Sequence, residues 1–512
     1  MEQAIQNVTD AAWIIAPELG MLAAATLLVL LGSFLPAGID GSPRRASQMF
    51  STMLAALVLM VPLVLIAIDR EAAAAAAANE NVATAFVRDG LTRVIQAASL
   101  LSGLVLLVLI RQRLNERYPA EHAACLLFIV AGVNLVAAAN DLIALFISLE
   151  LISIPTYVLL YLSRPDRRAL EATVKYFLLS VFSSAFLLYG MSFLLGSAGS
   201  TNFSLIEDSF RQPTGFVNVG MLQVALVMVV AGLGFRIASV PFHFYAPDVF
   251  QGTTMPSAAL LAVVPKIAGF VALVRLVWSI FFTDQLAQAF AGLEAYGTAL
   301  FAGLAILTMT VGNMLALLQT DVRRLLAYSS IAHAGYMLVG LAVPATVASP
   351  NGAQALLFYL LVYSVMTLGV FGVMLMLQKE GRSIYTVRDL NGLAAFNPLA
   401  ALLLAVFLFG LTGLPPTAGF WGKFNLLVVL WKSGSFALWL LAIGLAVNAA
   451  IAAWYYLRLI KSAYLDPQAP TVTSITPAQA PALYGVTTLL AVGAVAFFVF
   501  PNALWTLLRG IG

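Results

Sequence analysis

The sequence predicts an all-α, polytopic membrane protein with about 14 transmembrane helices, arranged as two inverted five-helix repeats that each contain a broken helix. Of its 512 residues, 62% are apolar and 10% are charged, whereas a soluble domain has roughly 45–50% apolar and about 25% charged residues. Apolar stretches long enough to cross a bilayer, roughly 20 residues in a helix, recur along the whole chain. Two of them hold prolines and glycines that must interrupt a helix. A soluble globular fold is therefore excluded.

Apolar runs bounded by charged residues, proline or glycine predict fourteen membrane spans. In chain order they cover residues 12–35, 49–68, 92–110, 121–139, 141–162, 170–195, 216–238, 257–281, 293–318, 325–343, 354–377, 397–430 (interrupted), 435–460 and 481–507. The longest connections are 69–91, which contains an alanine run, 196–215, 239–256 and 461–480. None of these is long enough to form a soluble domain.

The predicted spans group into four regions. Residues 1–115 form an N-terminal three-helix segment, 116–285 and 286–462 form the two five-helix repeats, and 463–512 form a C-terminal loop and last helix. The first repeat is broken near 236–243 and the second near 413–423. Because five is an odd number, the second repeat enters the membrane from the side opposite to the first. Discontinuous helices in corresponding halves of a transporter point to the transport site.

Basic residues orient the chain, because cytoplasmic loops carry the excess of Lys and Arg. Of the 26 basic residues, fifteen lie in one set of alternate loops and six in the other. The first set is therefore expected in the cytoplasm and both termini on the outer, periplasmic side. Met1 to Asp10 contain no Lys or Arg and so lack the positive region of a cleaved signal peptide. The absence of a targeting peptide, together with the compact termini, favours the plasma (inner) membrane of a bacterium.

Charge and cysteine content exclude several classes of partner and cofactor. A net charge of +3, with no run of more than two adjacent Lys or Arg residues, gives nucleic acid no electrostatic footprint. Cys125 is the single cysteine, so the chain cannot form an internal disulfide, a thiolate metal site or an iron–sulfur cluster. A Rossmann glycine fingerprint, a P-loop and a metal-spacing cluster are also absent from the sequence. We therefore expect no cofactor or metal in this chain.

Charged residues inside predicted spans are candidates for function, because a charge at the centre of a membrane helix costs about 2.5–3.5 kcal/mol on insertion scales. Glu150 is the only carboxylate deep within DLIALFISLELISIPTYVLL. Burial disfavours its charged form and a nearby cation favours it. This suits a proton-transfer switch, which we favour, and also a static salt bridge. Arg275 lies near a span end, where snorkelling or an ion pair accounts for it, and Lys175 follows Glu171 by four residues, so a local pair explains it as well as transport does.

Lys266 and Lys423 lie well inside apolar stretches. Removal from water disfavours the charged ammonium, so a buried lysine can exchange a proton where a surface lysine keeps it. Lys423 also follows GLPPTAG, whose freed backbone groups are tolerated in a bilayer only inside protein or along a wet cavity. His243, at the first break, and His333 are imidazoles that titrate near neutral pH. A hydrogen-bonded packing role is an equal alternative for each histidine.

Several motifs, in order and with matching spacing, resemble one family. They are SLELISIPTYVLLYL, RALEATVKYFLLSVFSSAFLLYG, GLGFRIASVPFHFYAPDVFQGTTMPSAALLAVVPKIAG, GNMLALLQTDVRRLLAYSSIAHAGYM and GLPPTAGFWGKF. These stretches, within residues 120–460, resemble the antiporter-like membrane subunits of respiratory complex I (NADH:quinone oxidoreductase). The likeness is to the NuoN type, NdhB in the cyanobacterial and plastid enzyme, because APDVFQG follows PFH where NuoM and NuoL relatives carry a PDAH-like sequence.

The resemblance implies a proton-translocating subunit, driven by quinone reduction elsewhere in the complex. It assigns proton-transfer roles to Glu150, Lys175, Lys266 and Lys423, and places His243 and His333 at family positions. It also implies that NADH, FMN, iron–sulfur clusters and quinone bind partner subunits, with NuoM-type and NuoK-type neighbours beside this chain in the bilayer. Arg236 stands where the family usually has lysine. Because arginine stays protonated, Arg236 is expected to act as a fixed countercharge to Glu150.

Two other readings of the sequence remain open. The same fold and polar residues occur in subunits of multisubunit cation/proton antiporters and of membrane-bound hydrogenases. Alternatively, the chain is a structural scaffold with a vestigial proton path, an interpretation that Arg236 keeps open because an arginine is a poor proton carrier.

Overall fold

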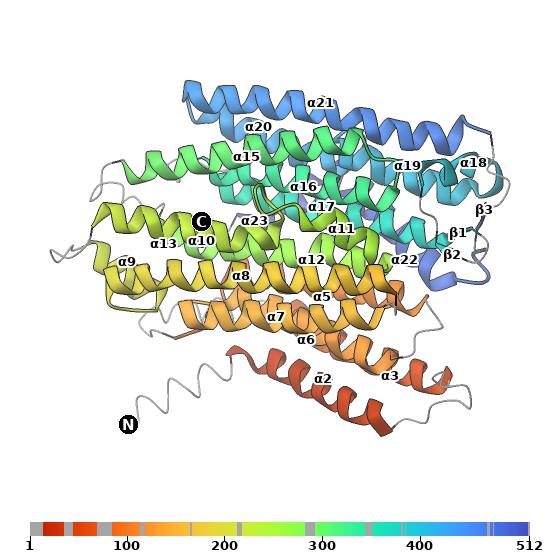
Figure 1. Ribbon diagram of the computed structural model, residues 1–512, viewed down its shortest axis with the longest axis horizontal. Helices are drawn as coiled ribbons and strands as arrows, with labels where there is room; N and C mark the ends of the chain where they lie inside the picture. The colour runs from red at the N-terminus through yellow and green to blue at the C-terminus, as the bar shows by residue number, and fades with distance from the viewer. Residues whose placement is uncertain are drawn as a thin grey trace.

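The computed structural model describes residues 14–34, 45–68, 84–112, 118–163, 166–211, 218–281, 292–343, 351–379, 382–383, 386–467, 472–474 and 476–509. Long helices lie side by side with nearly parallel axes (Figure 1). Met1 to Asp10 and the alanine run within 69–91 lie outside the described residues.

Every predicted span coincides with described helices. The N-terminal segment contains α2 (Ala16–Phe34), α3 (Arg45–Ile68) and α5 (Gly90–Arg111). The next region contains α6 (Pro119–Ala138), α7 (Leu142–Ser163), α8 (Arg167–Ala198), α9 (Phe203–Arg211), α10 (Val219–Ile237), α11 (Tyr245–Gly252) and α12 (Met255–Leu273), which continues as a π-helical turn η1 (Val274–Trp278) and α13 (Ser279–Phe281). Then follow α15 (Leu293–Leu317), α16 (Val322–Leu341), α17 (Gly352–Met376), a 3₁₀ turn η2 (Val387–Leu390), α18 (Leu393–Phe396), α19 (Pro398–Thr412), α20 (Ala418–Lys432), α21 (Phe436–Tyr464), α22 (Pro481–Val499) and α23 (Pro501–Leu508).

The predicted fold class, a polytopic membrane protein built mainly of helices, is confirmed. Within the described part of the chain, eleven helices are long and apolar enough to cross a membrane, and α2 and α19 are shorter apolar helices. The count of fourteen spans and the inverted repeats remain predictions. Both expected breaks are present, between α10 and α11 and between α19 and α20.

A small sheet, which the sequence did not predict, joins two connections. Strand β1 (Leu377–Lys379) pairs antiparallel with β2 (Arg382–Ser383) on one side and β3 (Val472–Ser474) on the other. Because β1 follows α17 and β3 follows α21, the pairing places the connections after these two helices at the same end of the bundle. The alternation of spans in the sequence requires the same placement.

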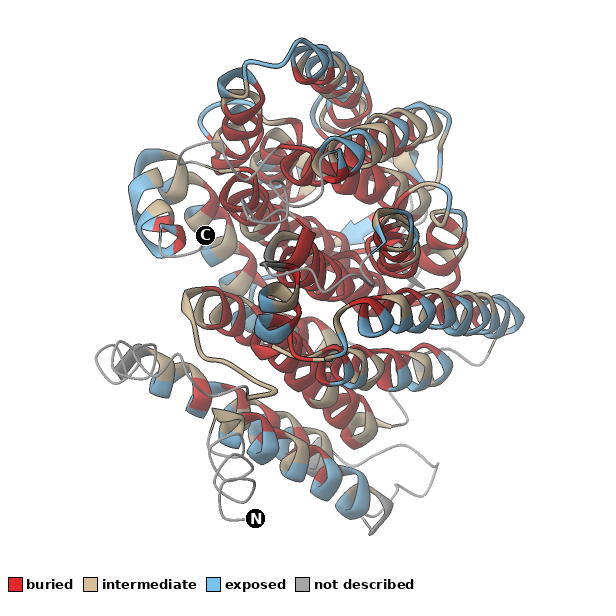
Figure 2. Cartoon of the chain, turned by 90° about the vertical axis from the view of Figure 1, so that its left-hand side faces the viewer, coloured by how far each residue is buried: buried red, intermediate tan, exposed pale blue. Residues whose placement is uncertain are grey.

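Buried residues gather in the centre of the bundle and exposed residues on its rim (Figure 2), and many of the exposed residues are large and apolar. Every residue of α12 is buried, whereas α8 exposes large side chains such as Leu178 and Phe182. An exposed apolar surface of this extent is unfavourable in water, but lipid or a partner helix can cover it. The close packing inside depends on small residues: a Cβ added at Gly312 would lie 2.6 Å from the backbone nitrogen of Ala332 on the neighbouring helix.

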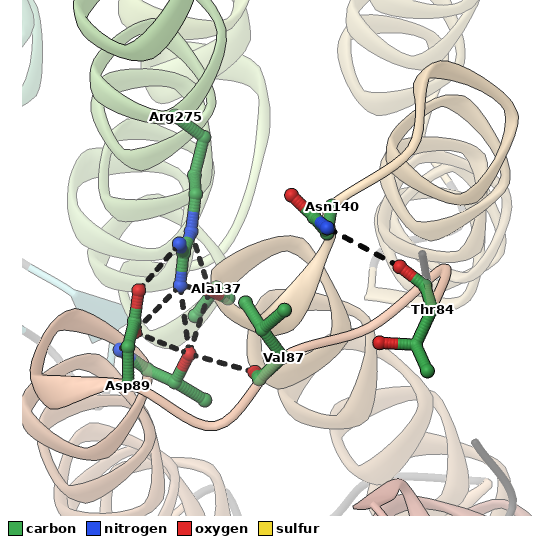
Figure 3. Close-up of polar contacts among 7 residues, drawn as sticks. Thr84, Val87, Asp89, Ala137, Asn140 and Arg275 are labelled. Carbon is green, nitrogen blue, oxygen red and sulfur yellow. Dashed lines mark hydrogen bonds and ion pairs between the residues drawn. The ribbon is translucent and has the colours of Figure 1, made fainter. Parts of the chain in front are cut away.

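Arg275 connects the N-terminal segment to the rest of the bundle (Figure 3). Its guanidinium forms a bidentate ion pair with Asp89, the N-cap of α5, at 2.6 and 2.7 Å. It also donates to the carbonyl oxygen of Ala137 at 2.9 and 2.5 Å and to the hydroxyl of Thr92 at 2.8 Å. Ala137 lies in the last turn of α6, where carbonyl groups have no partner within the helix. Of the two interpretations offered for Arg275, the ion pair is the one observed.

We predict that Arg275→Ala destabilises the protein by roughly 2 kcal/mol, because it removes the charged hydrogen bonds to Asp89 and two of the three donors to the Ala137 carbonyl, which keeps only the Thr92 hydroxyl. Thermal unfolding of the protein in detergent, followed by tryptophan fluorescence, measures this loss. The exposed Arg509 supplies the control, and Arg509→Ala should unfold at the wild-type temperature. Identical unfolding temperatures for Arg275→Ala and wild type would contradict a stabilising role.

Candidate functional site

Glu150 on α7 and Arg236 on α10 form an ion pair. The guanidinium Nη2 lies 3.1 Å from Oε1 of Glu150, and Nη1 donates to the carbonyl of Leu149 at 3.1 Å and to the hydroxyl of Ser153 at 2.9 Å. Ser184 donates to the same Glu150 oxygen at 2.6 Å. The Arg236 side chain is 5% exposed and that of Glu150 is 26% exposed. The arginine is thus fixed by three groups of α7, while the carboxylate reaches the side of the bundle.

The break after α10 explains the position of Arg236. Helix α10 ends at Ile237, and Ala238 takes a left-handed conformation with φ of 56°. Arg236 therefore lies in the last turn, where a cation interacts favourably with the negative end of the helix dipole. Tyr245 donates to the carbonyl of Phe235 at 2.9 Å, so a side chain of α11 satisfies a backbone group that the break leaves free.

Lys266 is buried at the centre of α12. It is 2% exposed, its ammonium donates to the carbonyl of Ser330 on α16, and its Nζ lies 5.3 Å from the centroid of the Tyr363 ring. Tyr363 in turn donates to the hydroxyl of Ser330 at 2.9 Å. No carboxylate of the described residues lies within ion-pair distance of Lys266. Dipoles and an aromatic face, rather than a negative charge, therefore compensate this cation.

His333 on α16 lies among buried tyrosines. Its Nδ1 is 2.7 Å from the hydroxyl of Tyr359, and its Nε2 is 2.9 Å from the hydroxyl of Tyr456. Tyr456 also hydrogen-bonds to Ser329. Both imidazole nitrogens thus have hydroxyl partners, and each hydroxyl can donate or accept.

Lys423 on α20 closes the second break. Its ammonium donates to the carbonyls of Leu411 and Thr412 at 3.1 and 2.8 Å, and its Nζ lies 4.7 Å from the centroid of the Tyr336 ring. Helix α19 ends at Thr412, and Gly413 has the left-handed φ of 88° that ends a helix. These two carbonyls are therefore among those without a partner within the helix, and Lys423 satisfies them.

Side-chain contacts connect Lys266 to Lys423. The His333 ring lies 5.1 Å from the Tyr363 ring and 5.5 Å from the Tyr336 ring, measured between centroids. Tyr363 contacts Lys266 and Tyr336 contacts Lys423. The Glu150–Arg236 pair adjoins this series through the backbone, because a Cβ added at Gly269 of α12 would lie 3.3 Å from that of Arg236. No hydrogen bond between described residues joins Arg236 directly to Lys266.

Lys175 lies apart from Glu150. Its ammonium is 2.7 Å from Glu171, the local pair considered above, and 2.8 Å from Asp248 on α11. Asp248 also pairs with Arg324 on α16 at 2.8 Å. Partial burial works against the charge of Asp248, but hydrogen bonds from Lys175 and Arg324 hold its pKa below the ordinary value of a carboxyl group. This partly exposed cluster ties α11 to helices of both predicted repeats.

His243 lies in the first break, between α10 and α11. Its ring is partly buried, and Nδ1 has no hydrogen-bond partner among the described residues. The structure does not bring His243 into contact with the Glu150–Arg236 pair or with Lys266.

Sequence reasoning did not identify the tyrosines that surround His333. Tyr336, Tyr359, Tyr363, Tyr455 and Tyr456 are all fully buried. Their spacing contained a signal: Tyr359 and Tyr363 are four residues apart and so share a helix face. The sequence also did not indicate Asn313. In the structure its amide accepts a hydrogen bond from Tyr455 at 3.0 Å and donates one to Tyr336 at 2.9 Å.

Comparisons with known proteins show the family of this chain. Residues 139–448 match the family described as "NADH:quinone oxidoreductase/Mrp antiporter, TM". NADH-quinone oxidoreductase subunit N of Trichlorobacter lovleyi is 42% identical, covering 71% of this chain and 72% of the relative. Subunit N 2 of Sorangium cellulosum is 37% identical over 97% of this chain and 96% of the relative. The chain belongs to the NADH-quinone oxidoreductase subunit N family.

A solved structure extends the likeness to three dimensions. A chain of respiratory complex I from Thermus thermophilus, determined with bound aureothin, superposes with a TM-score of 0.78 at 29% identity, covering 97% of this chain and 100% of that chain. The resemblance to NuoN-type subunits is thus confirmed. In the described part of this subunit N relative, no group of three or more His, Cys, Asp or Glu residues could hold a metal ion.

We predict that Arg236→Lys retains proton pumping, because an ammonium can still serve as countercharge to Glu150, whereas Arg236→Ala loses most of it. NADH-driven pumping in vesicles with matched amounts of assembled complex measures both variants. The exposed Arg167 supplies the control, and Arg167→Ala should pump normally. Equal pumping by Arg236→Ala and wild type would remove the countercharge role.

We predict that Asp248→Asn lowers stability by about 0.2–1 kcal/mol, the range for partly exposed ion pairs. Because the folded-state pKa of Asp248 lies below the unfolded value, about 3.9, the pair stabilises fully above that value and less as the pH falls through the folded-state pKa. The unfolding temperatures of variant and wild type, measured in detergent, should therefore converge below about pH 4. A difference that stays constant with pH would contradict the ion-pair origin.

Proposed function

We propose that this chain is the proton-translocating membrane subunit of a NADH-quinone oxidoreductase, in which quinone reduction elsewhere in the complex drives proton transport along its buried charged residues. The observation that carries the proposal is the contact series from Lys266 through Tyr363, His333 and Tyr336 to Lys423, with the Glu150–Arg236 pair beside it. Buried polar groups are costly in a membrane helix, and a static fold has no need of so many in one row.

Within this proposal, Glu150 is the proton-transferring member of the first pair and Arg236 is the fixed charge. Arginine keeps its proton, so Arg236 cannot pass one on. The change at this end is therefore geometric: a shift of α10 relative to α7 strengthens or weakens the 3.1 Å contact and thereby changes how readily Glu150 accepts a proton.

The proton is carried by Lys266, His333 and Lys423. Each has a hydroxyl, carbonyl or aromatic face as its neighbour, so none is locked in an ion pair with a described carboxylate. Charges in a low-dielectric interior interact far more strongly than in water. A proton that leaves one of these groups therefore changes the affinity of the next.

Two further residues act through the broken helix. Lys175, with Asp248, holds α11 in place, so we assign it a positioning role beside its family-implied part in proton transfer. His243 lies where α10 and α11 separate and is a candidate to pass a proton through the break. Its partly buried ring supports this assignment, as does its Nδ1, which has no hydrogen-bond partner within the described ranges.

We infer the surroundings of the chain from its family membership. This chain supplies no redox group, and NADH, FMN, iron–sulfur clusters and quinone belong to partner subunits. NuoM-type and NuoK-type neighbours cover part of the exposed apolar rim, for which the faces of α7, α8 and α21 are available. The complex lies in the inner membrane of a bacterium, with both termini of this chain on the periplasmic side.

The test is Lys266→Ala in membrane vesicles, with NADH-driven proton pumping and quinone reduction measured together. Loss of the only buried ammonium on α12 should reduce pumping and coupled turnover several-fold while the complex still assembles. Lys461, whose side chain is 64% exposed, supplies the control, because Lys461→Ala should retain both activities. If Lys266→Ala pumps and turns over like wild type, the chain is a scaffold with a vestigial path.

A further inference from the structure

Glu18 is a buried carboxylate outside the charged series. It lies in the first turn of α2, a helix at the edge of the bundle in Figure 1, and is 2% exposed. Its neighbours are Gln96 on α5 and Asn134 on α6. All three residues precede the region that matches the family, 139–448, so the family match assigns them no role.

The hydrogen bonds of this cluster are incomplete. Gln96 donates to Oε1 of Glu18 at 2.9 Å, but Oε2 of Glu18 has no partner among the described residues. Asn134 is fully buried, and its Nδ2 likewise has no described partner. An unmade hydrogen bond to a buried polar group costs about 1–3 kcal/mol, so two such atoms in one cluster require an explanation.

The hydrogen bonds of Ser99 indicate how a proton on Glu18 would satisfy the remaining polar atoms of the cluster. Its hydroxyl lies within hydrogen-bond distance of Oδ1 of Asn134 and, at 2.9 Å, of the carbonyl of Gln96. A hydroxyl has one hydrogen and can donate to only one of these acceptors. If the Asn134 amide is turned over, its nitrogen donates to Ser99, Ser99 donates to Gln96, and Oδ1 is free to accept from a protonated Glu18. The two ends of an asparagine amide are interchangeable in shape.

The charged groups around Glu18 do not pair with it. Arg88 acts on it through space, but its Nε donates to the carbonyl of Ile14 at 2.8 Å, and Asp89 is bound to Arg275. No other titratable residue on α5 or α6 lies within ion-pair distance of the Glu18 carboxylate; these residues are Arg93, Arg111, Glu121 and His122. The described side chains of α3 carry no charge. An ionised carboxylate in this position is unpaired, and burying an unpaired charge costs far more than burying a neutral acid.

We propose that Glu18, Gln96 and Asn134 form a second proton-binding site in the N-terminal helices. The proton binds to Oε2 of Glu18, which becomes a neutral acid and donates to the turned amide of Asn134. On release, the O–H bond of the acid breaks and the proton leaves to water. Helix α6, which carries Asn134, packs closely on α7, since a Cβ added at Gly132 would lie 3.1 Å from the carbonyl of Ser148. The site is distinct from proton transfer through Lys266 and can be tested without it.

Infrared difference spectroscopy on the purified complex tests the site directly. The wild-type spectrum minus that of Glu18→Gln should contain one C=O stretching band of a protonated carboxylic acid, and this band should shift in D₂O as the proton exchanges. Asn134→Leu should move the band in frequency without removing it, because it takes away only the hydrogen-bond acceptor. The partly exposed Glu121 of α6 supplies the control, and Glu121→Gln should keep the band.

Two results would overturn the proposal. The spectra are recorded at several pH values between about 5 and 9, a range centred on neutral pH. If the difference spectrum lacks such a band at every pH, the proposal is overturned. If Glu18→Gln fails to assemble, Glu18→Asp keeps a carboxyl group and should show the band at a shifted frequency, and its absence there would overturn the proposal equally. This experiment does not measure pumping through Lys266. If the Glu18 proposal fails, the proposed pumping function is therefore unaffected.

Discussion

The placement of cations against backbone carbonyl groups is the interaction on which the rest of the structure depends. Lys423 donates to two carbonyls at the end of α19, Lys266 to one on α16, and Arg236 to one on α7. A carbonyl offers a partial negative charge without a second ion. Each cation is thereby kept in the bundle at lower cost than in lipid, and the protons of Lys266 and Lys423 are not fixed by a described carboxylate.

Broken helices and tyrosines together create this environment. The break at Gly413 frees carbonyls for Lys423, and the break at Ala238 ends α10 just after Arg236. Between the two breaks, tyrosine rings fill the interior and their hydroxyls provide donors and acceptors around His333. Aromatic groups thus do two things here: they pack the core as apolar surface, and their hydroxyls hydrogen-bond to buried polar groups such as His333.

Ion pairs near the helix ends hold the interrupted elements in register. Arg275 joins the α5 N-cap to the last turn of α6, and Asp248 joins the short helix α11 to α8 and α16. Both act where helix ends leave backbone groups exposed. A helix of eight residues such as α11 has little packing surface of its own, so its position depends on such contacts.

The sequence by itself determined the membrane fold, the positions of the helices, the two breaks and the identity of the charged residues, because hydropathy, proline and glycine act locally along the chain. The sequence could not place Lys175 against Asp248, which is 73 residues away. It indicated only the ion pair with Glu171, which lies one helical turn before Lys175. Nor could it reveal the tyrosines around His333 or the burial of Glu18, which in isolation read as ordinary residues of apolar helices. Only the tertiary structure decided these, because a side chain's charge and hydrogen bonds depend on which helix faces meet, and hydropathy does not encode that choice.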